Sequence, residues 1–462
     1  MPRVVVISPP FASHATPLSA LAAALGERGA EVYIACAPAF ADLARRAGVG
    51  FVPLTVTRNA NTGVAEATDQ AAEEAARLAE FVRATAEGAV EALITQARHR
   101  RADMLADPHR VHAELRAVDD RLRPDWYVVD QLSYAATLAL HCLGLPYATF
   151  CPGHPTYVLS GPDALFGVPY AWPDAVRPPV SRLTELRSTA ETNDRLFTEL
   201  FAAFVRDTAP RTPVPPRAFA LTSPDAVVYA YPDLPWLPPR PRGPEHFFAG
   251  HMARPVRPLA AEWSRRLELL RARAARVVLV ALGTFLSARD DVLRTVVSGV
   301  LEGCPDTAVV VAAGDRAGRL ADLAGERVVV QPTVPQQQLL GHVDAMVHHG
   351  GGNSFTECLR AGVPSVILPL SSDQFAVARD AERAGVAVVL DPNALAPADV
   401  PRALDVLDTV VRPRLAPWSG EVGSRGPGWA AGRLLATMPD GAAASRSRRG
   451  GAGATVVRAP AR

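Results

Sequence analysis

The run from Val343 to Leu368 constrains the fold more than any other part of the sequence. An apolar stretch, Val343–His348, precedes three glycines at 350–352, a helical segment and a second apolar stretch, Ser365–Leu368. Short, fully apolar strands of this kind are typical of a parallel sheet covered by helices on both faces. Glycines let the backbone approach a ligand, and the free N–H groups that begin a helix favour an anion. The run therefore predicts an α/β sheet with an anion site at the turn.

Polar side chains surround this turn. Asn353 and Ser354 fall at the start of the helix, where residues of their kind cap the free N–H groups. His349 and Ser354 bracket the expected anion and can donate from a ring nitrogen and a hydroxyl. Glu357, one helical turn further on, is placed to accept hydrogen bonds from vicinal hydroxyls. This combination predicts a site for a diphosphate joined to a sugar with free hydroxyls.

Short apolar runs of the same kind recur along the chain and alternate with helical segments. They are Val4–Ser8, Val32–Cys36, Trp126–Val129, Tyr147–Phe150, Ala226–Ala230, His246–Ala249, Val277–Ala281, Ala308–Ala312, Val328–Val330 and Val386–Leu390. Alternation of this type favours parallel sheets, and 462 residues are too many for one compact core. We expect an α/β protein with two doubly wound, Rossmann-like domains that face each other across a cleft.

The domain boundaries follow from composition. We expect one domain over 1–250, a linker over 251–262 at the end of a proline-dense stretch, and a second domain over 263–426. A helix over 427–438 is predicted to fold back on the first domain, and the residues from 439 to the end are predicted to be disordered. Within the first domain, a helix is expected at Pro17–Arg28.

Two insertions in the first domain are expected beyond the carboxyl ends of strands, where open α/β sheets bind ligands. One, Ala65–Arg116, is rich in alanine, glutamate and arginine, has a helical pattern, and carries charges typical of a solvated helix face. The other, Cys151–Pro179, is rich in proline, glycine and aromatic residues and predicts loops.

The composition excludes several classes of protein. The net charge is +1, and five arginines lie in the last 22 residues, so the rest of the chain is slightly acidic, unlike a nucleic-acid-binding protein. No stretch approaches the roughly 20 apolar residues that span a bilayer. The sequence runs from Met1 directly into an apolar strand without a signal peptide, which predicts a cytoplasmic location. Five scattered cysteines without a CxxC pair indicate neither a disulfide framework nor a zinc site.

The segment PQQQLLGHVDAMVHHGGGNSFTECLRAGVPSVILPLSSDQ resembles the nucleotide-sugar signature of the inverting, family 1 GT-B glycosyltransferases. This superfamily includes plant natural-product and bacterial antibiotic transferases that use UDP- or dTDP-sugars. Three further stretches are similar to family motifs: SHATP at Ser13–Pro17, WYVVDQ at Trp126–Gln131 and VALGT at Val280–Thr284. The resemblance implies the GT-B fold, a nucleotide-sugar donor bound by the second domain and an acceptor bound by the first.

The resemblance also implies a role for each matching residue. His14 would be the general base that takes the proton from an acceptor hydroxyl, and Asp130 would orient its imidazole. The diphosphate would be held by Thr284, His349, Asn353 and Ser354 and by the backbone of Gly351 and Gly352. Glu357 would bind the ribose, the backbone around Val334 and Gln336 would meet the base, and Asp373 with Gln374 would bind the transferred sugar.

Several of these residues have a simpler alternative. Asp125 competes with Asp130, but Asp125 precedes its strand whereas Asp130 ends it. His348 is interpreted as a packing residue, and Asp373 with Gln374 can also cap the helix that follows. Among the other histidines only His154 is a candidate, as a residue that lines the acceptor pocket.

Two positions differ from the family pattern. Thr333 stands where plant members carry the tryptophan that stacks on uracil, and Ser13 replaces the glycine before the family's histidine. Glu357 in turn favours ribose over 2′-deoxyribose, because a buried acceptor left unpaired costs about 1–3 kcal/mol. We therefore expect UDP-sugars to be preferred over dTDP-sugars.

The expected reaction is an inverting, single-displacement transfer of a hexose from the nucleotide-sugar co-substrate to a hydroxyl of a small molecule, with a bacterial secondary metabolite as the expected acceptor. No cofactor or metal is expected, because the helix terminus and its neighbours can stabilise the departing diphosphate. The alternatives are a UDP-sugar epimerase and a non-catalytic nucleotide-sugar-binding helper. An NAD-dependent enzyme is disfavoured, since SPPFASHATP rather than GxGxxG follows the first strand.

Overall fold

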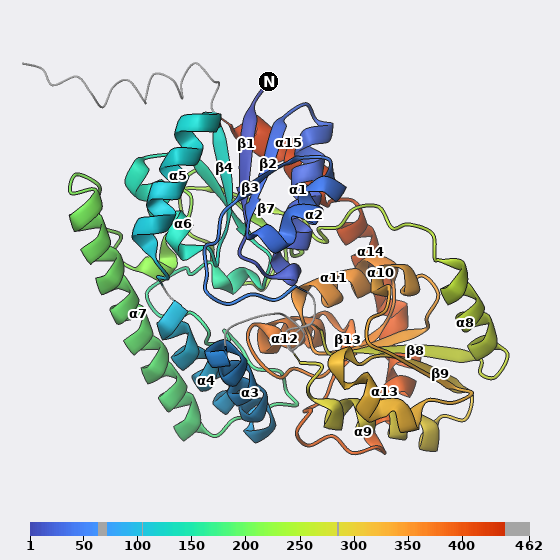
Figure 1. The fold of residues 1–462 in the computed structure, drawn as a ribbon. Helices are drawn as coiled ribbons and strands as arrows, with labels where there is room; N and C mark the ends of the chain where they lie inside the picture. The colour runs from blue at the N-terminus through green and yellow to red at the C-terminus, as the bar shows by residue number, and fades with distance from the viewer. Residues whose placement is uncertain (63–71, 104, 284–285, 439–462) are drawn as a thin grey trace, which may run out of the picture.

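The protein folds into two α/β domains stacked on each other (Figure 1). The computed structural model describes residues 1–62, 72–103, 105–283 and 286–438. Each domain is built on one sheet in which every strand pairs in parallel with its neighbours. The expected pair of doubly wound parallel sheets, the GT-B architecture, is confirmed.

The first sheet has seven strands in the order β3-β2-β1-β4-β5-β6-β7. They are β1 (Arg3–Ile7), β2 (Glu31–Cys36), β3 (Gly50–Pro53), β4 (Trp126–Asp130), β5 (Tyr147–Cys151), β6 (Ala226–Tyr229) and β7 (Glu245–Phe248). The strand order reverses between β1 and β4, and ligands of open α/β sheets bind at the carboxyl ends of the strands beside such a reversal.

The second sheet has six strands in the order β10-β9-β8-β11-β12-β13. They are β8 (Arg276–Ala281), β9 (Thr307–Ala312), β10 (Val328–Gln331), β11 (Ala345–His348), β12 (Ser365–Ile367) and β13 (Ala387–Val389). Here the order reverses between β8 and β11, so the glycine turn after β11 lies at the corresponding position of this domain.

Helices cover both sheets. They are α1 (Ala12–Glu27), α2 (Ala41–Ala47), α3 (Ala72–Glu87), α4 (Ala89–Asp103), α5 (Pro108–Leu122), α6 (Tyr134–Leu143), α7 (Val180–Thr208), α8 (Ala261–Arg271), α9 (Asp290–Gly303), α10 (Gln336–Leu339), α11 (Gly352–Ala361), α12 (Gln374–Ala384), α13 (Asp399–Val406), α14 (Leu415–Gly423) and α15 (Pro427–Thr437). No helix in the described ranges is long and apolar enough to cross a membrane.

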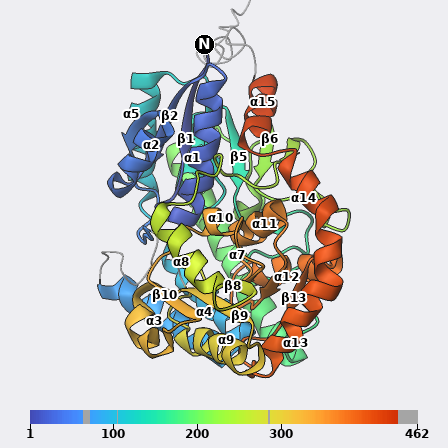
Figure 2. The same ribbon diagram turned by 90° about the vertical axis from the view of Figure 1, so that its right-hand side faces the viewer.

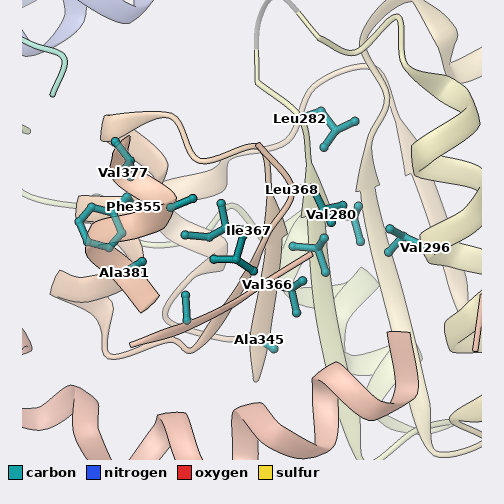
Figure 3. Close-up of a cluster of buried hydrophobic side chains, with 14 of the residues drawn as sticks. Val280, Leu282, Val296, Ala345, Phe355, Val366, Ile367, Leu368, Val377 and Ala381 are labelled. Atoms are coloured by element: carbon teal, nitrogen blue, oxygen red, sulfur yellow. The ribbon is translucent and has the colours of Figure 1, made fainter. Parts of the chain in front are cut away.

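The core of the second domain fixes the elements that surround the glycine turn. Val280 from β8, Val366 and Ile367 from β12 and Phe355 from α11 belong to one buried cluster, in which each is at most 3% exposed (Figure 3). Burial of a side chain of this size stabilises a fold by about 1.5–3 kcal/mol. The strands on either side of the turn and the helix after it are therefore fixed by the same core.

The last helices connect the two domains along one side of the molecule (Figure 2). The helix α14 packs against α11 of the second domain, and α15 packs against α1 of the first. Three buried residues of α15, Ala430, Ala431 and Leu434, belong to the core cluster of the first domain.

Some predicted boundaries differ from the observed ones. The first helix begins at Ala12 rather than at Pro17, so Pro17 lies inside it. The helix α8 begins at Ala261, inside the predicted linker. The Ala65–Arg116 insertion forms α3, α4 and most of α5, although 63–71 and 104 lie outside the described residues, as does the tail from 439 onwards. All five cysteines are free thiols.

Candidate active site

The first sheet brings His14 and Asp130 together across its strand reversal. His14 lies in the first turn of α1, directly after β1, and Asp130 is the last residue of β4. Nδ1 of His14 lies 3.0 Å from Oδ2 of Asp130, whose side chain is fully buried, whereas 19% of the His14 side chain is exposed. A carboxylate only accepts, so Nδ1 donates to it, and Nε2 is left to accept a proton.

Two carboxylates act on the charge of His14. Burial lowers the pKa of His14, but the charge of Asp130, its hydrogen bond and the charge of Asp373 together outweigh burial, so the pKa is raised above 6.5. The neighbouring charges therefore stabilise the imidazolium that forms when His14 takes a proton. Asp130 comes from the first domain and Asp373 from the second.

Pro17 explains how the His14 turn is joined to the second domain. In an ordinary helix, the N–H of residue 17 would donate to the carbonyl of residue 13, but proline has no N–H. The carbonyl oxygen of Ser13 instead accepts a hydrogen bond of 2.9 Å from Nδ2 of Asn353, at the start of α11. The residue predicted to hold the diphosphate thus also fixes the distance between α11 and the residue that precedes His14.

Two glycines make room for the ring of His349. A Cβ at Gly283 would lie 2.4 Å from Cε1 of His349, and a Cβ at Gly351 would lie 2.6 Å from its Nε2. Gly283 also has φ of +75°, which a side chain would strain. Burial lowers the pKa of His349 to about 4, against a backbone hydrogen bond at Ala281. Its Nδ1 is buried and has no hydrogen-bond partner among the described residues.

The neighbouring histidine shapes the turn. His348 is fully buried, and its Nδ1 accepts a hydrogen bond of 3.0 Å from the backbone N–H of Gly350. Burial, followed by the effect of His349, lowers the pKa of His348 to about 3. His348 is therefore neutral and holds the glycine turn through a local bond.

Two glutamines hold the carboxylate of Glu357. Nε2 of Gln336 donates to Oε2 of Glu357 at 2.6 Å and to Oγ of Ser354 at 3.1 Å, and Nε2 of Gln337 donates to Oε1 of Glu357 at 2.9 Å. Burial raises the pKa of Glu357, although these hydrogen bonds and the charge of Arg360 oppose the rise. Both carboxylate oxygens thus have a partner without any ligand, and a deoxyribose would not leave Glu357 unpaired.

Most of the other residues predicted to bind the donor form hydrogen bonds with the backbone of the protein itself. Oδ2 of Asp373 accepts a hydrogen bond of 2.7 Å from the backbone N–H of His154 in the first domain. Oε1 of Gln374 accepts the backbone N–H groups of Leu370 and Ser371, so this amide holds its own loop. The carbonyl of Val334 accepts the N–H of Gln336 at 2.9 Å. Thr284 lies outside the described residues.

Sequence reasoning overlooked several residues of this site. Gln337 and the side chain of Gln336 hold Glu357, although only the backbone near Gln336 was expected to take part. The run of three glutamines at 336–338, directly after a proline and before the glycine turn, was the available signal. Within the described ranges there is no group of three or more His, Cys, Asp or Glu side chains that could hold a metal ion.

Comparison with known proteins shows a resemblance to glycosyltransferases over the second domain and the end of the first. Residues 227–412 match the family model described as UDP-glucoronosyl and UDP-glucosyl transferase. This part of the chain, from β6 to the residues after α13, therefore resembles that glycosyltransferase family. Among curated relatives, the chain is 28% identical over 176 residues to a rabbit (Oryctolagus cuniculus) UDP-glucuronosyltransferase 2B16, covering 37% of this chain and 32% of that protein. It is 35% identical over 103 residues to a demethyllactenocin mycarosyltransferase of Streptomyces fradiae, covering 22% of each.

Solved structures show the same fold over nearly the whole chain. The glycotransferase of kitacinnamycin matches with a TM-score of 0.66 and 23% identity, covering 95% of this chain and 99% of that one. The glycosyltransferase VinC, solved in complex with dTDP, matches with a TM-score of 0.61 and 20% identity, covering 96% and 100%. The matches to the two curated relatives span about a third or less of their own length.

Proposed function

We propose that this protein is an inverting glycosyltransferase that moves a sugar from a nucleotide-sugar to a hydroxyl of a small-molecule natural product. The observation that carries the proposal is the His14–Asp130 pair, 3.0 Å apart, which is tied to the donor helix α11 by the bond from Asn353 to the Ser13 carbonyl. A general base held beside a diphosphate site suits a single displacement reaction between the two domains.

In the proposed mechanism, Nε2 of His14 takes the proton of the acceptor hydroxyl as its oxygen attacks the anomeric carbon. The bond from that carbon to the diphosphate oxygen breaks on the opposite face, so the configuration is inverted. The fully buried carboxylate of Asp130 stabilises the imidazolium, as in other carboxylate–histidine pairs. General-base catalysis of this kind contributes about 10²- to 10⁴-fold.

The departing diphosphate would be stabilised by the start of α11 and by His349. The N-terminus of a helix offers free N–H groups and a partial positive charge. A bound diphosphate would raise the low pKa of His349, so that the ring binds the phosphate as a charged donor. We propose that these groups suffice without a divalent cation.

The donor preference rests on Glu357. We propose that vicinal ribose hydroxyls displace the amide groups of Gln336 and Gln337 and bind the carboxylate, so that UDP-sugars are preferred over dTDP-sugars. Because the amides already satisfy Glu357, the preference is worth one exchanged hydrogen bond rather than an unpaired charge. That is about 1 kcal/mol, or roughly fivefold. The dTDP complex of the neighbour VinC makes dTDP the appropriate rival.

The acceptor is proposed to be an apolar or mixed bacterial secondary metabolite. Beside the 151–179 insertion, the first domain has a buried aromatic core in which Tyr134, Phe166, Phe197 and Phe219 contact one another, and we propose that the surface next to this core binds the acceptor. Two of the proteins compared above are named for the molecules kitacinnamycin and demethyllactenocin.

Thermal-shift titrations with UDP and dTDP test the donor assignment, and Glu357→Ala is the variant that removes the ribose contact. We expect UDP to bind about fivefold more tightly than dTDP and the variant to abolish this difference. Equal binding of both nucleotides, unaffected by the variant, would refute the ribose argument.

Product analysis tests the alternatives of an epimerase and a non-catalytic helper. We expect a new glycoside only when donor and acceptor are both present. Conversion of the donor sugar to an epimer without an acceptor would favour the epimerase. Donor binding without any turnover, across a panel of hydroxylated aglycones, would favour the helper.

A further inference from the structure

A buried carboxylate that the proposed reaction does not use joins the two domains. Asp380 lies in α12 of the second domain and is fully buried. All four side chains that donate to it come from the first domain: Nε2 of His154 at 2.9 Å, Nε1 of Trp236 at 2.9 Å, the hydroxyl of Tyr231 at 3.0 Å and the hydroxyl of Tyr170. These five residues are called the α12 clasp below.

The α12 clasp offsets the free-energy cost of burying the charged Asp380 carboxylate. A charged group loses its hydration when buried, and only close hydrogen bonds compensate for this loss. Burial raises the pKa of Asp380, but the bonds from His154, Tyr170 and Trp236 outweigh burial, and the pKa is lowered. Asp380 is therefore ionised at neutral pH. If α12 moved away from the first domain, a buried charge would lose four donors together.

His154 links the clasp to the predicted sugar site. Its ring donates to Asp380, while its backbone N–H donates to Oδ2 of Asp373 at 2.7 Å. Asp373 immediately precedes α12 and Asp380 lies in its second turn, so one residue of the first domain holds both. A substitution of the His154 side chain breaks the contact with Asp380 and leaves the N–H that bonds to Asp373.

The loop before α12 is held from the first domain as well. Ser372 has φ of +57°, a conformation that costs energy for a residue other than glycine. Its Oγ accepts a hydrogen bond of 2.7 Å from Nε2 of Gln96 in α4. Strain of this kind persists only where the surroundings hold it. The place of Asp373 therefore depends on residues of the first domain on both of its sides.

We propose that His154 and Asp380 are positioning residues that set the place of Asp373 in the donor-sugar site. This inference rests on the proposed function, in which Asp373 binds the transferred sugar. Of the clasp residues, Tyr231 lies against α11, with its ring 5.6 Å from that of Phe355, and Tyr231→Phe keeps this ring contact while it removes the bond to Asp380. Weakening the clasp therefore impairs use of the whole nucleotide-sugar while it leaves binding of UDP alone unchanged.

The chain offers matched variants for the test. Tyr231→Phe removes one buried hydroxyl bond across the domains, and Tyr147→Phe removes a comparable bond, 2.9 Å to the carbonyl of Thr222, within the first domain. His154→Ala removes the donor to Asp380, whereas the amide of His154→Gln can replace Nε2 as that donor.

The experiment measures KM and kcat for UDP-glucose and, separately, the affinity for UDP by thermal shift. We expect Tyr231→Phe and His154→Ala to raise KM about tenfold, with UDP affinity within twofold of wild type, because each loses one bond to a charged group. Tyr147→Phe and His154→Gln should stay within about threefold of wild type in KM. Unchanged KM in both clasp variants, or an equal loss of UDP affinity, would overturn the proposal.

Two further measurements keep the test decisive. If His154→Ala does not fold, Tyr170→Phe removes a donor at the partly exposed edge of the clasp and takes its place. Small-angle scattering of Asp380→Ala separates the clasp from the proposed function. A larger radius of gyration than that of wild type would support the clasp even if wild type transfers no sugar. An unchanged radius, together with unchanged KM in Tyr231→Phe, would refute the clasp even if transfer is observed.

Discussion

Asp130→Asn should lower kcat more than Asp130→Ala, which removes the carboxylate altogether. Oδ1 of Asp130 accepts the backbone N–H of Leu132 at 2.9 Å, and Oδ2 faces Nδ1 of His14 at 3.0 Å. The Leu132 N–H can only donate, so the amide oxygen of asparagine must stay on that side. The amide NH₂ then faces His14, and Nδ1 must accept from it.

The consequence is the wrong tautomer of His14. With Nδ1 accepting, the ring proton lies on Nε2, which can no longer take a proton from the acceptor. Turning the amide around would leave the half-buried Leu132 N–H facing an NH₂ group, at a cost of about 1–3 kcal/mol. Together with the lost carboxylate charge, we expect kcat to fall about 10³- to 10⁴-fold.

Asp130→Ala is the matched variant, because it removes the charge without imposing a tautomer. Here we expect a smaller loss, about 10²-fold, provided that the variant folds. Steady-state kinetics over pH 5–9 provide the assay. In wild type, activity rises with pH as His14 loses its proton, at a pKa above 6.5. Since Asp130 raises this pKa, the acidic limb of Asp130→Ala should move to lower pH. Greater activity in Asp130→Asn than in Asp130→Ala, or a limb that moves upward, would refute this reasoning.

Three further outcomes are expected. Gly283→Ala should displace the His349 ring and raise KM for UDP-glucose at least tenfold. Gly318→Ala is the control and should leave KM unchanged, because no atom lies within 4 Å of its Cβ. Similar KM values in the two variants would contradict the packing argument. Glu357→Gln should melt at a higher temperature than wild type at pH 7 but not at pH 4. The pKa of Glu357 is raised in the folded protein, so its ionised form destabilises the fold once the pH exceeds that pKa. Calorimetry at both pH values checks this, and a gain at pH 4 alone would count against it. Transfer should continue in excess EDTA, and its complete loss, restored by Mg²⁺, would show that a cation is needed.

The strands could be predicted because their burial is uniform. Val277–Ala281 and Trp126–Val129 are fully apolar and short, and each became a strand at that place. The edge strand β3 was not predicted, since Gly50–Pro53 has only four residues and includes a glycine and a proline. Proline is common in the first turn of a helix, and a start at Pro17 would place it there, whereas the helix begins at Ala12. Pro17 is tolerated inside α1 because the side chain of Asn353 donates to the Ser13 carbonyl, which receives no hydrogen bond from a proline.

The site was predictable only where sequence neighbours form it. Gly351, Ser354 and Glu357 lie on one turn and one helix, so their spacing alone places them. Asp380 is different, because its partners are 144 to 226 residues away in the sequence. The only local signal was an acidic residue on the apolar face of α12, between Val377 and Ala381. Long-range contacts of this kind are fixed by the tertiary fold and leave no periodic pattern.

The most direct test of the central claim is the turnover of His14→Ala with UDP-glucose and a hydroxylated aglycone that wild type glycosylates. The account predicts a loss of about 10²- to 10⁴-fold in kcat, with unchanged affinity for UDP. Turnover that stays within a few-fold of wild type would contradict the assignment of His14 as the general base.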